Sequence, residues 1–280
     1  MGIGSIILLG AFLNTIGTYL DKILMDKGIS KRNYFYFMCL TMLPFSLISM
    51  GIEAKLGTFK IEINYTVIIL LITIMLLRYL KQKNFVSVFR KIEPFELKTY
   101  MSLPLIICYI IDVIFKIETF SILKVSSAIL IVLGVFLIFQ GKHSIKSLNK
   151  DLFIRIILDV SYSYVLYFIL KHMSSGVFIF LMNVILTLIF TPIYKPFNKE
   201  NDYKSFLGLV LLQQTFGFTY TYITYYLAET SVTLSKFVFP VALIMITIFA
   251  FISQKRKKPT IKNMFGITSS IAGIILLQLL

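Results

Sequence analysis

Apolar residues in this chain fall into long runs separated by short polar and basic stretches. About ten such runs occur, each of roughly 17–23 residues, the length of a helix that crosses a bilayer core. Strands of a membrane barrel would be shorter and would alternate in polarity. Because backbone groups in lipid must be satisfied within the segment, the runs predict an all-α integral membrane protein. The predicted spans are 3–24, 33–52, 63–80, 99–115, 121–140, 152–171, 175–194, 205–227, 232–253 and 263–280.

Composition agrees with this pattern, since 58% of the 280 residues are hydrophobic and only 15% are charged. A soluble domain carries about a quarter charged residues. The net charge of +15 does not indicate a nucleic-acid partner, because little soluble surface is left to present it. Lys and Arg are concentrated in the odd-numbered connections between spans, and a basic run that begins at Arg78 is expected to shorten the third span. By the positive-inside rule, these connections are predicted to be cytoplasmic and both termini outside.

A polar linker at 142–150 divides the chain into two halves of five predicted spans, 1–141 and 151–280. Both halves carry a glutamate at the start of a span, a proline inside that span, a Glu or Gln after it, and a glycine in the last span. These positions are Glu93, Pro104, Glu118 and Gly134 in the first half and Glu229, Pro240, Gln254 and Gly273 in the second. An odd number of spans in each half makes the repeat inverted, an architecture typical of secondary transporters. Proline inside a helix frees a carbonyl and bends the helix, so Pro104 and Pro240 are hinge candidates.

This arrangement resembles the drug/metabolite transporter superfamily, and within it the EamA-like proteins. The residues that carry the resemblance are Pro104, Glu118 and Gly134, echoed by Pro240, Gln254 and Gly273. It extends over essentially the whole chain and implies ten transmembrane helices as two inverted five-helix repeats. It also implies that both termini are inside, against the charge pattern. The chain departs from the family in having Gln254 in place of a second Glu. It also has no Trp, which substrate sites of this group often use.

Polar residues within the spans are the candidate substrate site, because such groups are costly in lipid and usually face protein or a cavity. Desolvation disfavours the charged form of Asp159, so it could carry a proton or pair with an organic cation. The alternative for Asp159 is a hydrogen-bonded structural role. The eighth span is the most polar, and its tyrosines could pack on a ligand or simply on other helices. The candidate substrate-binding residues are Asn14, Thr18, Asp159, Ser163, Asn183, Gln213, Gln214, Tyr220 and Tyr225.

The sequence contains no P-loop and no zinc motif, and neither His143 nor His172 has a partner at ligand spacing. We therefore expect neither an enzyme nor a cofactor or metal site. The leading hypothesis is a secondary transporter of a small polar or amphipathic metabolite, an organic cation or amino-acid-like solute, with a proton as candidate coupling ion. The alternatives are a translocator of lipid-linked sugars or lipid head groups and a non-transporting scaffold subunit. The expected setting is a bacterial or archaeal plasma membrane, as a monomer or homodimer.

Overall fold

The computed structural model describes residues 2–89, 100–138, 150–195, 203–252 and 261–278, and helices make up almost all of them. Glu93, Gln254, His143 and the predicted linker up to residue 149 lie outside the described residues. The helices are α1 (Ile3–Asp26), α2 (Lys31–Leu56), α3 (Tyr65–Phe89), α5 (Leu103–Ile114), α6 (Ile122–Ile138), α7 (Lys150–Leu170), α8 (Ser175–Tyr194), α9 (Tyr203–Thr230), α10 (Val232–Lys236), α11 (Val238–Ile252) and α12 (Ile261–Gln278).

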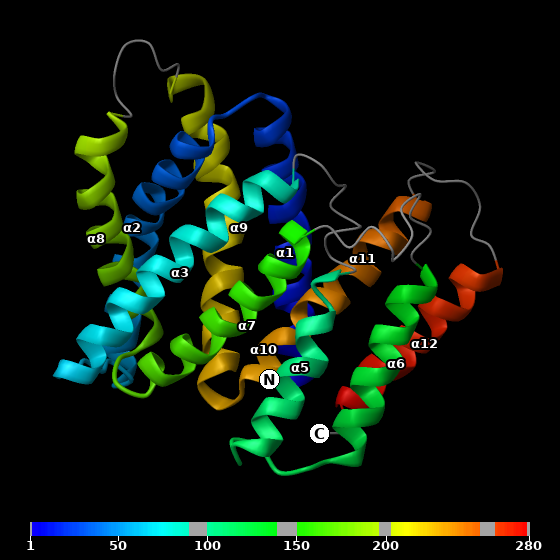
Figure 1. Cartoon of the computed structure of the whole chain (residues 1–280). Coiled ribbons are helices and arrows are strands. Elements are labelled where there is room, and N and C mark those ends of the chain that lie inside the picture. Colours follow the sequence, from blue (N-terminus) through cyan, green and yellow to red (C-terminus); the bar gives the residue numbers. More distant parts are fainter. Residues whose placement is uncertain (1, 90–99, 139–149, 196–202, 253–260, 279–280) are drawn as a thin grey trace.

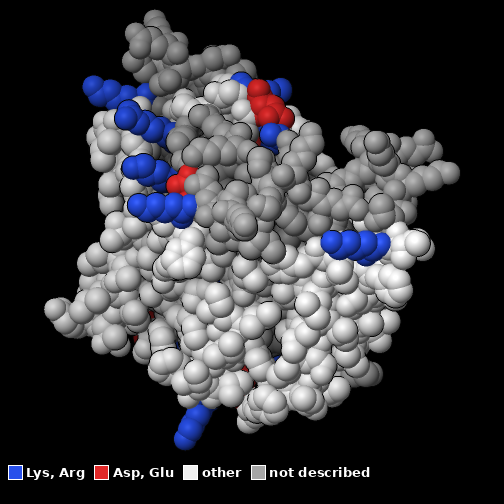
Figure 2. Space-filling model, turned by 45° about the vertical axis from the view of Figure 1, so that its right-hand side comes forward, with Lys and Arg blue, Asp and Glu red and all other residues white. Residues whose placement is uncertain are grey.

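Five of these helices are long and apolar enough to cross a membrane: α1, α2, α3, α7 and α8. Further apolar helices are shorter, including α5, α6 and α12. The prediction of an all-helical membrane protein is confirmed at this level, whereas the count of ten spans and the inverted repeat stay predictions. Much of the outer surface is apolar, as a lipid-facing surface requires, and Figure 2 shows Lys and Arg gathered mainly toward the upper end of one face.

Two predicted spans and the position of one predicted residue differ from the helices found. The third does not end at its basic run, because α3 continues to Phe89 and turns Arg78 and Lys81 toward the interior. The ninth is interrupted at Phe237, which separates the short α10 from α11. Glu229 does not begin a span but lies near the end of α9, where it is exposed.

Both predicted hinge prolines lie near helix starts rather than in helix centres. Pro104 occupies the first turn of α5, and Pro240 follows the break between α10 and α11 by a few residues. The first amides of a helix have no carbonyl partner within it, so a proline there costs no hydrogen bond. Pro104 therefore does not kink α5, whereas Pro240 lies beside a real interruption of the helix.

The chain runs back and forth along one bundle, and both termini lie at the same end of it (Figure 1). The main neighbouring pairs are α2 with α8, α1 with α9, α3 with α7, α1 with α11, and α6 with α12. Apolar cores lie between these helices, among them one between α2, α3, α7, α8 and α9 and another between α1, α5, α6, α9 and α11. At the end that carries the termini, a short antiparallel bridge between Ile61 and Met173 joins two connections.

Helices α6 and α12 pack along a glycine seam, formed by Gly134 and Gly273 with Ser127 and Ser270. A Cβ added at Gly273 would lie 2.9 Å from the Ser127 carbonyl oxygen, and one at Gly134 would overlap the backbone of Gly266 and Ser270. Only glycine permits this approach. The Ser127 hydroxyl donates to the Gly273 carbonyl at 2.7 Å across the seam. The two glycines singled out in the sequence thus meet the same interface from opposite helices.

Candidate functional site

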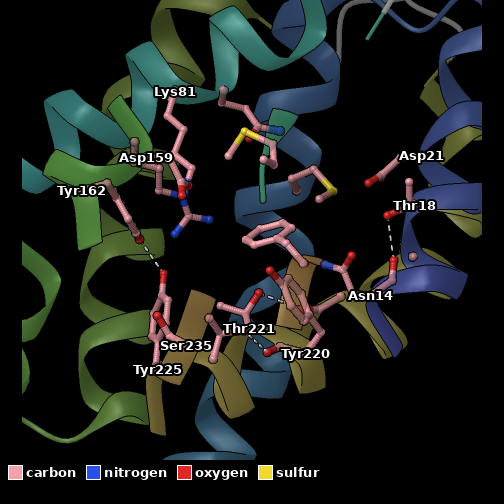
Figure 3. Close-up of a pocket in the computed structure, with 18 of the residues that line it drawn as sticks. Asn14, Thr18, Asp21, Lys81, Asp159, Tyr162, Tyr220, Thr221, Tyr225 and Ser235 are labelled. Atoms are coloured by element: carbon pink, nitrogen blue, oxygen red, sulfur yellow. Dashed lines mark hydrogen bonds and ion pairs between the residues drawn. The ribbon is translucent and has the colours of Figure 1, made fainter. Parts of the chain in front are cut away.

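A cavity of about 240 Å³ lies inside the bundle, at the meeting point of α1, α2, α3, α7, α9 and α10. Its lining mixes apolar side chains with hydroxyls, amides and charged groups. In Figure 3, Lys81, Asp159 and Tyr162 stand on one wall, and Asn14, Thr18 and Asp21 stand on the opposite one. Tyr220 and Thr221 of α9 lie between these walls. The cavity therefore collects polar groups from helices that are far apart in the sequence.

Seven of the nine predicted site residues line this cavity: Asn14, Thr18, Asp159, Ser163, Gln213, Tyr220 and Tyr225. Several are also fixed by bonds within their own helices, because a hydroxyl in a helix can donate to the carbonyl one turn earlier. Thr18 donates to the Asn14 carbonyl at 2.7 Å, and Ser163 donates to the Asp159 carbonyl at 2.8 Å. Their placement supports a shared polar site.

Asn183 and Gln214 do not line the cavity, although both are fully buried. The Asn183 amide donates to the Ile179 carbonyl at 2.6 Å, and its side-chain oxygen accepts from Arg78 at 2.9 Å. The Gln214 amide donates to the side-chain oxygen of Gln213 at 2.6 Å. Each therefore supports a residue that does face the cavity.

Asp159 is completely buried and lies between two lysines. Lys81 of α3 approaches one carboxylate oxygen at 2.6 Å, and Lys236 of α10 donates to the other. The Lys236 side chain is only 4% exposed. The Lys81 ammonium also lies 4.4 Å from the centre of the Tyr162 ring, a cation–π arrangement. The expectation that Asp159 receives an organic cation does not fit this geometry, because both oxygens already hold a protein cation.

The break between α9 and α10 brings Lys236 into the interior. Asp112 of α5 is fully buried and accepts hydrogen bonds from the Thr233 amide at 2.9 Å and the Thr233 hydroxyl at 2.6 Å. Its other oxygen accepts from the Tyr164 hydroxyl at 2.8 Å. Ser231 caps the short helix by accepting from the Leu234 amide. A carboxylate at a helix N-terminus is stabilised by the helix dipole, so Asp112 fixes the turn that positions Lys236.

Two arginines complete the basic lining of the cavity. Arg78 of α3 is half-buried and donates to Asn183. Arg155 of α7 is 8% exposed and donates to the Lys81 carbonyl. In the described part of the chain, four basic side chains thus line the cavity, against the two carboxylates of Asp21 and Asp159. Asp21 in turn accepts from the Tyr34 hydroxyl at 2.8 Å.

None of these four basic residues was predicted from the sequence. Lys and Arg near span ends were interpreted as topology determinants, which is their commoner role. A signal was nevertheless present, because Arg155 stands one helical turn before Asp159, and such a pair shares a helix face. A buried cation so close to a predicted buried carboxylate indicates a charge network rather than a solvent-facing helix end.

Compared with models of known families and with curated proteins, the chain matches none of them. The resemblance to the drug/metabolite transporter superfamily therefore stays a prediction that depends on the motif residues and on the arrangement of spans.

Proposed function

We propose that this protein is a secondary transporter that carries a small polar solute across a membrane by alternating access between its two halves. The observation that carries the proposal is the cavity with charged and polar groups in its wall, lined by helices of both halves in a bundle whose outer surface is largely apolar. Charged groups inside such a bundle are costly, and those that occur there commonly mark a transport or binding site. A helix interrupted beside the cavity, as at Phe237, is a common feature of transporter sites.

The helix contacts support two halves related by an inverted repeat. With α1, α2, α3, α5 and α6 matched in order to α7, α8, α9, α11 and α12, a two-fold axis would pair α2 with α8 and α6 with α12. The same axis would map the contact between α1 and α9 onto the contact between α7 and α3. It would map the contact between α1 and α11 onto the contact between α7 and α5. All of these pairs are in contact. Rocking of one half against the other would then open the cavity to alternate sides.

For orientation, we infer that the end of the bundle opposite the termini faces the cytoplasm of a bacterial or archaeal cell. Basic side chains gather toward that end in Figure 2, and the termini lie at the other end in Figure 1. The positive-inside rule supports this placement. A reporter that is active only in the cytoplasm, fused after Leu280, should stay silent. A strong signal would reverse the orientation without changing the cavity.

Alternating access can be tested with two threonines of α9. Thr221 lines the cavity, whereas Thr219 is exposed on the outer face of the same helix, and each donates to the carbonyl one turn earlier. In a background without Cys39 and Cys108, Thr221→Cys should react with a membrane-impermeant maleimide added to either side of oriented vesicles. Thr219→Cys, which faces lipid, should react from neither side.

Labelling of Thr221→Cys from only one side would contradict alternating access. Labelling from neither side would favour the scaffold interpretation, because the cavity would then be closed to water. Both outcomes concern access alone and do not depend on which solute is bound.

A further inference from the structure

We propose that the cavity binds an oxyanion, a phosphate or carboxylate group on a small solute, and that Arg78 is its principal contact. This inference rests on the proposed function, since it assigns the class of solute that the transporter would carry. It differs from the organic cation expected from the sequence, and it depends on how the charges are distributed around the cavity.

The basic side chains outnumber the acidic ones in the cavity lining that the structure describes. Arg78, Lys81, Arg155 and Lys236 face Asp21 and Asp159. Charges interact strongly when they are removed from water, so an excess of one sign inside the bundle attracts a ligand of the opposite sign. A cation entering the cavity would meet this excess and would be repelled.

Asp159 cannot neutralise the excess by itself. One carboxylate serves two ammonium groups, Lys81 on one oxygen and Lys236 on the other. An organic cation would have to displace one of these lysines from Asp159, and the displaced ammonium would remain inside the bundle. The lysine pair instead offers further N–H donors, because each ammonium has three.

Arg78 is the group best placed to meet a ligand. Its guanidinium donates to Asn183 at 2.9 Å and contacts the sulfur atoms of Met42 and Met182. Over the described ranges of the chain, no carboxylate forms an ion pair with it. A guanidinium has five donors in a planar fork that fits two oxygens of a carboxylate or phosphate. Both terminal nitrogens of the guanidinium make these contacts, and an incoming oxyanion would replace the weak ones to the two sulfur atoms.

The volume of the cavity limits the size of the solute that carries the anionic group. Sites for drug-sized ligands occupy about 300–1,000 Å³, and this cavity of about 240 Å³ is smaller. The groups near the basic cluster include the rings of Tyr162 and Tyr220. The geometry therefore fits a compact acid or phosphate ester that has a short polar or apolar body.

The test is direct binding to the purified full-length chain in nanodiscs of neutral phosphatidylcholine. Calorimetric titration with glycerol phosphate, succinate and choline should show binding of one or both anions and none of choline. Binding of choline but of neither anion would overturn the proposal, as would the absence of all binding. Neither result would bear on the cysteine labelling of Thr221, so the transporter proposal is judged separately.

Variants then locate the site. Arg78→Gln should weaken anion binding roughly tenfold, as expected when a charge-assisted contact is lost, whereas Arg78→Lys should retain part of the affinity. Lys83→Gln is the matched control, because Lys83 lies on the same helix but is exposed and does not line the cavity. Equal affinity in Arg78→Gln and the wild type would show that any anion binds elsewhere and would overturn the assignment.

A lipid head group could supply the same phosphate chemistry. A second set of nanodiscs containing phosphatidic acid separates the two sources. If phosphatidic acid abolishes glycerol phosphate binding to the wild type but does not change the residual binding of Arg78→Gln, the oxyanion comes from the bilayer. If the soluble anion binds equally well in both kinds of nanodisc, the solute comes from water. Either result supports an oxyanion site at Arg78.

Discussion

The cavity and the glycine seam show two ways in which one chain packs helices inside a membrane. Around the cavity, α3, α7 and α10 are joined by long side chains, and Lys81, Asp159 and Lys236 meet there as ions. At the seam, α6 and α12 approach until backbone meets backbone at Gly134 and Gly273. The first arrangement leaves space that water or a solute can fill, and the second leaves none.

The difference shows where this bundle can change shape. Close backbone packing has a single well-fitting geometry, since helices without a hydrophobic driving force between them depend on contact for association. Ion pairs tolerate several arrangements of long side chains, and a bound solute can replace one partner. We therefore expect the seam to behave as a fixed support and the cavity wall as the part that moves.

The largest effect is expected from breaking the charge cluster. Asp159→Asn would leave two lysines without their shared carboxylate, which should lower the free energy of unfolding by about 3 kcal/mol. Removing Lys236 as well, as Asp159→Asn with Lys236→Met, should restore part of this loss. The free energy of unfolding of each variant is measured by adding sodium dodecyl sulfate to the protein in a mild detergent.

Asp26→Asn is the control for that experiment, because its ion pair with Lys22 is on the surface and such pairs contribute little. Wild-type stability of the Asp159→Asn protein would mean that the lysines are well hydrated. The cavity would then be open rather than held together by ions.

A smaller effect is expected at the seam. Gly134→Ala places a methyl group against the backbone of α12, and overpacking of this kind costs about 1–3 kcal/mol. Gly208→Ala on α9 is the matched control, since a Cβ there meets nothing within 4 Å. The same unfolding titration compares the two. Equal stability of both variants would contradict the close approach of α6 and α12.

The smallest effect is expected from the hydrogen bond across the seam. Ser127→Ala removes the bond to the Gly273 carbonyl, and such interhelical bonds contribute about 0.6 kcal/mol on average. Ser126→Ala changes the neighbouring, half-buried serine and should be close to neutral. A loss in Ser127→Ala as large as that in Gly134→Ala would mean that the bond, rather than backbone contact, holds the seam.

The sequence was sufficient to predict the helical membrane character of the fold and seven of the residues that line the cavity. Asp159 could be identified because a carboxylate inside an apolar run is costly in lipid and usually faces protein or a cavity. Arg78 and Lys81 could not, since a basic run at the end of an apolar segment usually marks the membrane surface. The placement of Lys236 in the interior was also hidden, because the turn before it is held by hydrogen bonds that Asp112, a residue distant in sequence, accepts from Thr233.

The buried carboxylates have a consequence for how the protein is made. In the described part of the chain, Glu53 of α2 accepts hydrogen bonds from Ser174, the Gly176 amide and Tyr222, all of which belong to the second half. Asp112 likewise depends on donors of the second half. Both acids are synthesised before these partners. Because a buried carboxylate without hydrogen-bond donors is costly, we expect the first half to reach its final packing only after α9 and α10 have been made.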